Sequence, residues 1–492
     1  MQLDTITLAW ATHRLGGVQT PANAQYGQSE IEHQLRDSGA KCLFTCLPLL
    51  DTARAACKTV GIPESKIFLL ELPKAVTQGM SGGKLRTVDD LIKDGSSCPA
   101  LEPLNWSKGE GARRVAFLCY SSGTSGLPKG VMISHRNVIA NTLQTHTHEL
   151  ESRKKMSKPG QEYTEKCLGL LPMSHIYGLV VVCHVSLYRG DGVVVLPKFE
   201  MKSFLEAIQT HKIANLYLVP PIIIMLTNSA KALQQYDLSS VRAIFTGAAP
   251  LGEETAQDLS KMFPSWAIRQ GYGLTETSTV VSSTTPEDIW FGSSGSLLTG
   301  YEARLVTVEG NEVTGYDQPG ELWVKSPSVT LGYLNNDKAT KETFTDGYMR
   351  TGDEAVFRKN PKSGHEHLFI TDRIKELIKV KGLQVAPAEL EAFLLTHPAV
   401  SDCVVIGVPD DRDGEVPKAF IVKSPEVGLE ESDRMVKRDI AKYVEKQKAK
   451  HKWLKGGIDF IDVVPKSPSG KILRRLMRDQ EKEKRRKAGA KL

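Results

Sequence analysis

The stretch Tyr120–Gly130, which reads YSSGTSGLPKG, combines residue types that could hold a polyphosphate. Its three glycines let backbone N–H groups turn inward around an anion, and its hydroxyls and Lys129 add hydrogen-bond donors and positive charge. The apolar run Val115–Cys119 precedes it and Val131–Ile133 follows it, so we predict a loop between two strands. A flexible linker is the alternative interpretation, but Pro128 and Lys129 within a strand-loop-strand pattern favour the phosphate loop.

This loop differs from a Walker A loop in two ways. Pro128 stands where that pattern has a glycine, and no Ser or Thr follows Lys129. We therefore expect a phosphate-binding loop of another type.

Two later segments combine glycines with side chains that suit a nucleotide or a metal ion. In LPMSHIYGL, residues 171–179, His175 and Tyr177 follow a proline in an apolar context, where a buried structural histidine is the simple alternative. In RQGYGLTET, residues 269–277, glycines flank an aromatic ring that could stack on a planar base, and Glu276 could face a metal ion.

Three further segments place charged residues at a turn, in a charged run and on a small-residue loop. Asp353 lies in GYMRTGDEA, where an aspartate that stabilises a turn is the alternative. SPSGKILRR, residues 467–475, presents Lys471 on a Ser/Gly loop. A charged run lies between Asp353 and Lys471 in the sequence and contains Asp372, Arg373, Lys375 and Lys379. In isolation, this run would indicate a solvated basic face. The order and joint occurrence of all these segments argue for shared chemistry.

Size and composition are typical of a globular protein with more than one domain. The chain has 492 residues, of which 40% are hydrophobic and 24% charged. No apolar stretch approaches the roughly 18 residues that cross a bilayer. The eight cysteines form no CxxC pair, which predicts reduced thiols in an intracellular compartment, with Cys119 and Cys183 in the core.

The net charge of +6 has its origin at the end of the chain. Residues 472–492 contain nine Lys or Arg against three Asp or Glu, so the rest of the chain sums to about zero. A nucleic-acid-binding protein would carry a basic face on a domain, so we exclude nucleic acid as a partner. The ending Ala490-Lys491-Leu492 resembles the SKL peroxisomal address, which predicts recognition by the peroxisomal import receptor and a location in the peroxisomal matrix, otherwise the cytoplasm.

Alternating patterns predict an α/β fold. Val241–Thr246 reads as a strand and Glu253–Met262 as the helix after it, and Cys403–Val408 before PDDRDG reads as the strand of another such unit. Phe344–Ile370 has the texture of strands and turns, and Pro387 indicates the start of a helix.

We predict a domain boundary near Asp372. The final part looks like a small α+β domain, and its charged helix near residues 432–452 presents a solvated face. The predicted units are an N-terminal domain (1–371), a hinge (372–375), a C-terminal domain (376–475) and a basic tail (476–492).

Taken together, these motifs resemble the acyl-adenylate-forming superfamily of acyl-CoA synthetases, adenylation domains and firefly luciferase. The match runs from about Arg14, in RLGGVQTPANAQY, to Lys471, and the 4-coumarate–CoA ligase-like or aryl-CoA ligase-like branch looks closest. The segments that carry this likeness are LPMSHIYGL, GAAPLG, QGYGLTE and KVKGLQVAPAELE. The resemblance implies a large multi-layer domain of αβα sheets with a small β-barrel, truncated at its start, followed by a small mobile α+β lid.

The resemblance implies a reaction in two halves. A carboxylate attacks the α-phosphate of ATP to give acyl-AMP and pyrophosphate, and the thiol of coenzyme A then displaces AMP. Lys471 would bridge the carboxylate and the α-phosphate, while Thr124 and Glu276 would bind Mg²⁺. The residues that the likeness assigns to ATP are Ser121, Ser122, Gly123, Thr124, Ser125, Gly126, Lys129, Gly247, Ala248, Ala249, Gln270, Gly271, Tyr272, Gly273, Thr275, Glu276, Asp353 and Arg373. Among them, Asp353 with Arg373 would take the ribose hydroxyls, and Tyr272 would flank the adenine.

For the second half, the family rotates its small domain about a hinge that matches Lys375. Lys471 then leaves the site, and the segment that comes in lines the pantetheine tunnel, with Lys379, Lys381, Gly382, Leu383 and Gln384 implied as its residues. A free thiol titrates near pH 8.5, so a proton acceptor is needed. His175 is one candidate, and a lining role in the pocket is the alternative.

The acyl pocket is where the sequence departs from coumarate ligases. The likeness assigns it His175, Tyr177, Phe245, Ala248, Gly271, Thr279 and Val280. Phe245 replaces a lysine of the plant enzymes, and an apolar ring would disfavour a phenolic hydroxyl that loses its partner on burial. We therefore predict an unhydroxylated aryl acid, such as phenylacetate or cinnamate, or a medium-chain fatty acid.

A second departure lies at the start, because family members have roughly sixty more residues upstream. We expect an exposed sheet edge and apolar surface there. Two alternatives to a CoA ligase stay open: an adenylating enzyme that hands its acyl group to a carrier protein, and a non-catalytic nucleotide- or acyl-binding remnant.

Overall fold

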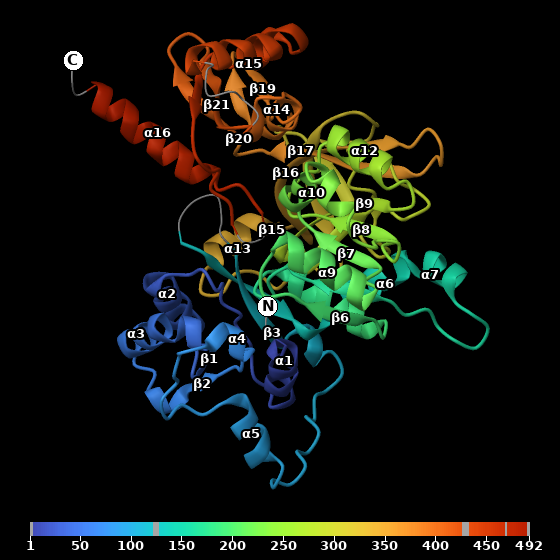
Figure 1. The fold of residues 1–492 in the computed structure, drawn as a ribbon, viewed down its shortest axis with the longest axis vertical. Helices are drawn as coiled ribbons and strands as arrows, with labels where there is room; N and C mark the ends of the chain where they lie inside the picture. Colours follow the sequence, from blue (N-terminus) through green and yellow to red (C-terminus); the bar gives the residue numbers. More distant parts are fainter. Residues whose placement is uncertain (1–2, 122–126, 426–431, 468–469, 490–492) are drawn as a thin grey trace.

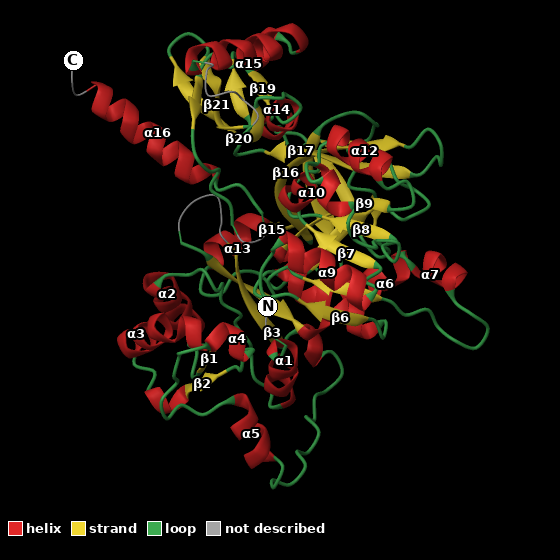
Figure 2. Ribbon diagram, viewed as in Figure 1, coloured by secondary structure: helices red, strands yellow, loops and turns green. Residues whose placement is uncertain are grey.

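The computed structural model describes residues 3–121, 127–425, 432–467 and 470–489. It has a large N-terminal domain and a small C-terminal domain at one end of it (Figure 1). Strands form the centre of both domains and helices cover them, which confirms the predicted α/β fold (Figure 2). Among the described residues, no helix is both long and apolar enough to span a bilayer.

A seven-stranded sheet forms the centre of the large domain, in the order β11-β10-β9-β8-β7-β5-β6. Its strands from β6 to β9 run parallel, and β10 and β11 are antiparallel. The strands are β5 (Lys166–Gly169), β6 (Gly192–Val195), β7 (Asn215–Leu218), β8 (Ala243–Thr246), β9 (Ala267–Leu274), β10 (Thr279–Ser283) and β11 (Ser296–Leu297).

Alternate side chains of these strands serve two different cores, because successive side chains of a strand point to opposite faces. Leu216 and Ile244 face a helical layer, whereas Tyr217 and Phe245 face the other side of the sheet. The helices on the first face are α9 (Met201–His211), α10 (Pro220–Thr227), α11 (Ala230–Leu233) and α12 (Glu253–Met262). The predicted strand and helix around Val241–Thr246 and Glu253–Met262 are thus confirmed by β8 and α12.

The other face meets helices and a second, antiparallel sheet. The helices nearby are α6 (His135–His148), α7 (Leu150–Met156), the π-helix Tyr177–Val185 and α8 (Ser186–Tyr188). The sheet order is β13-β12-β14-β16-β15, with β17 paired to β16. Its elements are β12 (Glu302–Val306), β13 (Glu312–Val313), β14 (Gly320–Lys325), α13 (Asp337–Thr343), β15 (Phe344–Thr345), β16 (Tyr348–Lys359) and β17 (Glu366–Arg373). These strands confirm the strands and turns predicted for Phe344–Ile370.

The predicted phosphate loop connects two paired strands. β3 (Val115–Ser121) and β4 (Lys129–Ser134) form an antiparallel pair in which Ser121 lies opposite Lys129. This confirms the strands predicted on either side, while Ser122–Gly126 lie outside the described residues. The elements before this pair, coloured blue in Figure 1, are α1 (Thr5–Arg14), α2 (Gln28–Ser38), β1 (Leu43–Thr45), α3 (Leu50–Val60), β2 (Ile67–Leu69), α4 (Lys74–Thr77) and α5 (Val88–Gly95).

The small domain is a five-stranded sheet with helices packed on it. The sheet order is β19-β18-β21-β20, with β22 on β21. Its elements are β18 (Ile378–Val380), β19 (Leu383–Val385), α14 (Pro387–Leu394), β20 (Val400–Asp410), β21 (Gly414–Lys423), α15 (Asp433–Gln447), β22 (Ile458–Phe460) and α16 (Arg474–Gly489). The helix predicted to start at Pro387 is confirmed, and α15 buries only one stripe, Val436, Ile440 and Val444.

One sequence prediction about this domain was wrong. Cys403–Val408 lies in a strand, but β20 is followed by β21 and not by a helix. The segment PDDRDG forms a hairpin turn in which Asp410 pairs with Gly414, and Gly414 adopts a φ of +79°. Polar turn residues of this kind precede a strand as readily as a helix.

The predicted hinge 372–375 stays a prediction, and in the fold it spans the end of β17 at Arg373 and the residues before β18. The segment predicted as a basic tail is helical as far as Gly489, and Met477 and Glu481 on it are buried. Figure 1 shows this helix, α16, leading away from the large domain to the C-terminus. All eight cysteines are free thiols, and Cys119 and Cys183 are buried as predicted.

Candidate active site

A cavity of about 770 Å³ lies where the two domains meet. Both domains contribute to its walls, because Lys466, Ser467 and Lys471 come from the small domain and most of the others from the large one. The predicted site residues that line it are Ser121, Lys129, His175, Ala248, Gly273, Thr275, Glu276, Arg373, Lys375 and Lys471. Six segments that are far apart in the sequence thus converge on one space.

At one end of the cavity, a carboxylate is held next to the phosphate loop. Glu276 accepts hydrogen bonds at Oε1 from the Ser121 hydroxyl (3.2 Å) and from the Tyr333 hydroxyl (2.9 Å). The ammonium of Lys129 lies 4.9 Å from the centre of the Tyr333 ring. Sequence reasoning missed Tyr333, which lies in the loop between β14 and α13 with no motif around it.

This carboxylate suits a magnesium ion that is bound largely through substrate phosphates. Mg²⁺ prefers oxygen ligands and is usually held by one or two carboxylates together with phosphates and water. In the described part of the chain, there is no group of three or more His, Cys, Asp or Glu that could hold a metal ion by itself. Glu276 could serve as the one carboxylate of a magnesium ion that is held mainly by phosphates and water. Thr124, the other predicted ligand, lies outside the described residues.

A second carboxylate lies beside the cavity on strand β16. Asp353 is 4% exposed, and its Oδ2 accepts a hydrogen bond of 2.5 Å from the Tyr272 hydroxyl. Arg373 approaches it with Nε 3.5 Å from Oδ1, because the two residues lie opposite each other in the β16–β17 pair. Burial raises the pKa of Asp353, while the charge of Arg373 and the Tyr272 hydroxyl act in the opposite direction.

The small domain brings an ammonium group to the same place. Burial lowers the pKa of Lys471 to about 8, and the positive charge of Arg373 acts in the same direction. The negative charges of Glu376, Asp353 and Glu276 oppose this shift. Lys471 therefore lies within electrostatic reach of both carboxylates of the large domain, where its charge depends on the pH.

A glycine seats the loop of Lys471 against the large domain. Gly470 has a φ of +80°, which side chains rarely allow, and an added Cβ would lie 3.1 Å from Val219 Cγ2. Val219 directly precedes α10, so the loop touches the start of that helix. Within the loop, the Lys471 N–H donates to the Ser467 hydroxyl and the Ser467 N–H donates to the Lys471 carbonyl.

His175 is held neutral in the wall of the cavity. Burial lowers its pKa to about 4, and the charge of Lys471 acts in the same direction. At neutral pH its ring is therefore uncharged and can accept a hydrogen bond. Its Nδ1 accepts one from the Tyr177 N–H at 3.3 Å.

Among the residues predicted for the acyl pocket, the Phe245 ring is packed in the core. The Tyr177 hydroxyl donates to the Phe245 carbonyl (2.7 Å), and the two rings pack edge to face with centres 5.9 Å apart. An added Cβ on Gly271 would lie 2.5 Å from Phe245 Cζ, so the ring fills the space that this glycine leaves. Thr279 and Val280 are buried nearby, with 7% and 3% of their surface exposed.

The other predicted residues around the nucleotide have structural contacts of their own. Gln270 accepts from the Leu251 N–H at 3.0 Å and donates to the Ser293 carbonyl at 3.3 Å. Ala248 adopts a left-handed φ of +70° at the cavity wall, between Gly247 and Ala249.

The residues predicted to bind coenzyme A are not brought to this cavity. Lys379, Lys381, Gly382 and Leu383 are exposed on the β18–β19 hairpin, and none of them lines the cavity. The Lys381 ammonium lies 3.0 Å from Asp413 Oδ1 within the small domain. The structure thus joins Lys471 to the large domain and leaves the Lys379 segment apart.

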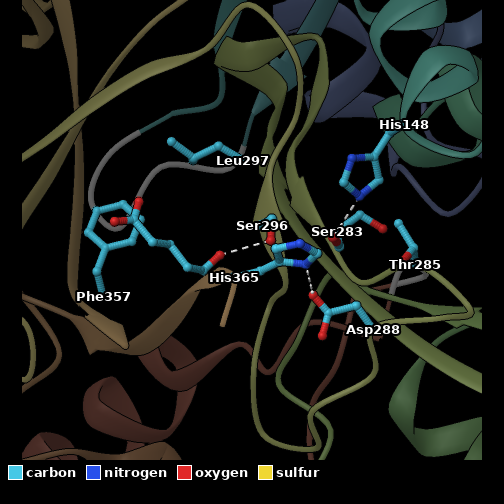
Figure 3. A pocket seen from close by; sticks show the side chains of 9 residues that line it. His148, Ser283, Thr285, Asp288, Ser296, Leu297, Phe357 and His365 are labelled. Carbon is cyan, nitrogen blue, oxygen red and sulfur yellow. Dashed lines mark hydrogen bonds and ion pairs between the residues drawn. The ribbon is translucent and has the colours of Figure 1, made fainter. Parts of the chain in front are cut away.

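A second cavity of about 480 Å³ lies between the two sheets, away from these residues (Figure 3). His148 Nε2 donates a hydrogen bond of 2.8 Å to the Ser283 carbonyl, and His365 and His367 both contact Asp288 Oδ2, at 2.7 and 3.0 Å. Asn360 and Ser363 also donate to Asp288. None of the predicted site residues lines this cavity, and its carboxylate is already surrounded by donors.

Comparisons with known proteins find relatives over nearly the whole chain. An acyl-CoA ligase of Emericella nidulans, easD, is 42% identical over 477 residues, which cover 96% of this chain and 82% of the relative. A probable 4-coumarate–CoA ligase of Dictyostelium discoideum is 35% identical over 97% of this chain and 83% of its own length. The solved structure of the anthranilate CoA ligase AuaEII in complex with anthranoyl-AMP is 26% identical, with a TM-score of 0.81 over 96% of this chain and 84% of that one.

Two family matches cover most of the chain. Residues 389–471 match the AMP-binding enzyme C-terminal domain, and residues 1–334 match the family described as AMP-binding enzyme. With its motifs, its two-domain fold and these matches in agreement, the chain belongs to the AMP-binding enzyme family, within the acyl-adenylate-forming superfamily that its sequence resembles.

Proposed function

We propose that this protein is an AMP-forming acyl-CoA ligase, which joins a carboxylic acid to coenzyme A at the expense of ATP. The observation that carries the proposal is the meeting of Lys471 with Glu276 and Arg373 at one cavity, within electrostatic reach of the buried Asp353. The relatives named acyl-CoA ligases match nearly the whole chain, which supports the same reaction.

In the first half-reaction, two anions must approach each other. An oxygen of the acid forms a bond to the α-phosphorus of ATP while the bond from that phosphorus to pyrophosphate breaks. Lys471 supplies a positive charge where negative charge builds up, and Lys129 with the Ser121 hydroxyl lies where the outer phosphates would be held. Glu276 would hold Mg²⁺ together with Thr124, and the ion would neutralise phosphate charge.

The large domain orients the nucleoside. Asp353 offers a buried carboxylate to the ribose hydroxyls, and Arg373 and Tyr272 fix its direction through the contacts described above. Because these three side chains already contact one another, they need little rearrangement when the nucleotide binds.

In the second half-reaction, the sulfur of coenzyme A forms a bond to the acyl carbon while the bond from that carbon to AMP breaks. Lys471 occupies the cavity and the Lys379 segment lies on the exposed surface, so we propose that the small domain must turn about Lys375 between the two halves. In the turned arrangement, Lys379, Lys381, Gly382 and Leu383 would line the path of the pantetheine arm. His175, neutral at pH 7, could then accept a hydrogen bond from the thiol.

The substrate that we propose is an aryl acid without a hydroxyl group, with a medium-chain fatty acid as the second choice. Phe245 closes the pocket with an apolar ring, supported by Tyr177 and Tyr217, and offers no partner to a buried phenolic hydroxyl. The solved relative that holds anthranoyl-AMP is an aryl-CoA ligase, which agrees with this choice.

The experiment that tests the function measures AMP and thioester release across a panel of aryl and aliphatic acids. We expect both products in equal amounts, with phenylacetate or cinnamate turned over faster than 4-coumarate. Pyrophosphate exchange without a CoA thioester would favour transfer to a carrier protein instead. Tight ATP binding without AMP release from any acid would indicate a non-catalytic remnant.

We also propose import into the peroxisomal matrix through Ala490-Lys491-Leu492, which lie outside the described residues. A fluorescent protein fused to the start of the chain should enter peroxisomes. The same fusion without Leu492 should stay in the cytoplasm, and identical distributions of the two would contradict the proposal.

A further inference from the structure

The chain crosses between the two domains next to a carboxylate that contacts both. Asp372 is the last residue but one of β17 and is 8% exposed. It lies opposite Glu354 in the β16–β17 pair, which fixes its backbone in the large domain. Its Oδ1 accepts a hydrogen bond of 2.7 Å from the Arg373 N–H.

The other oxygen of Asp372 reaches the small domain. Its Oδ2 accepts a hydrogen bond of 3.0 Å from the N–H of Ala388, the second residue of helix α14. The residue before this helix, Ala386, has no side chain that could cap it. The first N–H groups of a helix lack partners within the helix, so Asp372 acts as a cap that comes from the other domain.

Helix α14 belongs firmly to the small domain. Leu390 and Leu394 on it are fully buried in the core that β18, β20 and α15 share. A bond to Ala388 therefore restrains the whole small domain and not only a loose segment.

From α14, a chain of ion pairs leads to the catalytic loop. Glu391 on this helix binds the guanidinium of Arg474, and Arg474 also lies 3.2 Å from Glu376. Arg474 starts α16 only three residues after Lys471. Whatever fixes α14 against the large domain thus fixes the loop that carries Lys471.

We propose that Asp372 is a positioning residue, which caps α14 across the domain boundary and so holds Lys471 in the cavity. The consequence for the two half-reactions rests on the proposed function, whereas the domain contact itself does not. Removal of the cap should weaken the arrangement in which Lys471 meets the large domain, and the first half-reaction should suffer more than the second.

A pair of introduced cysteines can report this arrangement without any catalysis. An added Cβ on Gly252, just before α12, would lie 3.6 Å from Cβ of Ala392 on α14. This separation lies within the range of disulfides. In the pair Gly252→Cys with Ala392→Cys, we expect oxidation to join the domains, and Asp372→Ala should slow that oxidation about five- to thirtyfold.

The activity measurement follows the two half-reactions separately, in the Asp372 variants with and without the cysteine pair. In Asp372→Ala, pyrophosphate release should fall about five- to thirtyfold, while thioester formation from synthetic acyl-adenylate should not fall. Asp372→Asn should lie between this variant and the parent, because an amide has only one oxygen for the two N–H groups. Oxidation of the cysteine pair should restore pyrophosphate release to Asp372→Ala.

The matched control is another helix cap far from the boundary. Thr87 caps α5, which has eight residues like α14, through a 3.1 Å bond from the Asp90 N–H. Thr87→Ala should leave cysteine oxidation and both half-reactions unchanged. Equal oxidation rates with and without Asp372 would overturn the proposal. Equal loss of both half-reactions without rescue by the disulfide would overturn it too.

The proposed function has a separate test. An unmodified chain that releases no pyrophosphate with any acid would overturn the proposed function, and the oxidation rates would still decide the role of Asp372.

Discussion

The two domains contribute to the active site in different ways. In the large domain, the functional side chains contact one another: Tyr272 and Arg373 contact Asp353, and Ser121 and Tyr333 contact Glu276. In the small domain, Lys471 reaches the site on a loop whose position depends on contacts elsewhere, at Gly470 and Arg474. Under the proposed function, the large domain would hold the nucleotide with side chains that already contact one another. The small domain would bring the charge for the first chemical step.

The largest expected effect is the loss of the delivered charge. Lys471→Ala should slow adenylate formation by about two to three powers of ten, because one stabilising contact to the developing charge is lost. Thioester formation from synthetic acyl-adenylate should stay within about twofold of the parent, if the small domain has to remove Lys471 for that step. Lys484→Ala, which removes an exposed lysine paired with Asp459, is the control. An equal loss of both half-reactions in Lys471→Ala would contradict the separate roles that we give to the two domains.

A smaller effect is expected from a substitution in the large-domain part of the site, where Asp353 lies. Asp353→Ala removes a buried carboxylate and should raise the KM for ATP about tenfold to a hundredfold, with the KM for coenzyme A unchanged. Asp346→Ala, in an exposed turn of the same sheet, serves as the control for general damage. An unchanged KM for ATP in Asp353→Ala would separate this carboxylate from nucleotide binding.

All the residues predicted for the acyl pocket lie in the large domain, so a substitution among them should change only the choice of acid. Phe245→Leu should raise kcat/KM for bulkier acids relative to smaller ones by about tenfold, because the ring that fills the space beside Gly271 is shortened. The milder replacement avoids the larger cavity that alanine would leave. If acid preference stays the same while stability falls, the ring is only part of the core.

The smallest effect is the dependence of adenylation on pH, which we attribute to Lys471 of the small domain. Lys471 has a pKa of about 8, so it is charged below that pH and loses its proton as the pH rises. Adenylation measured as kcat/KM for ATP should therefore decline above about pH 8. Lys471→Arg keeps its charge to much higher pH, so its profile should be flat in this range even if its rate is lower. A decline shared by both proteins would assign the titration to another group.

Much of this site could be predicted from the sequence, because its residues lie in short segments with distinctive neighbours. Asp353 and Arg373 stand in such segments, but their meeting depends on the register of β16 and β17, which sequence alone does not specify. Tyr333 could not be found, since its role arises from the position of one loop over the phosphate strands. The cap from Asp372 to Ala388 joins residues whose spacing resembles no helix or strand period, and the hairpin after β20 shares its turn composition with strand-to-helix connections.

The contact of Gly470 with Val219 bears on how natural variants of this protein are interpreted. A genome survey that asks only whether Lys471 is present would count any such allele as functional. A chain with alanine or valine at position 470 would keep that lysine, yet its backbone would be strained at a φ of +80° and its Cβ would press on Val219 at the start of α10. We expect alleles of this kind to slow adenylate formation, even though every reactive group is still encoded.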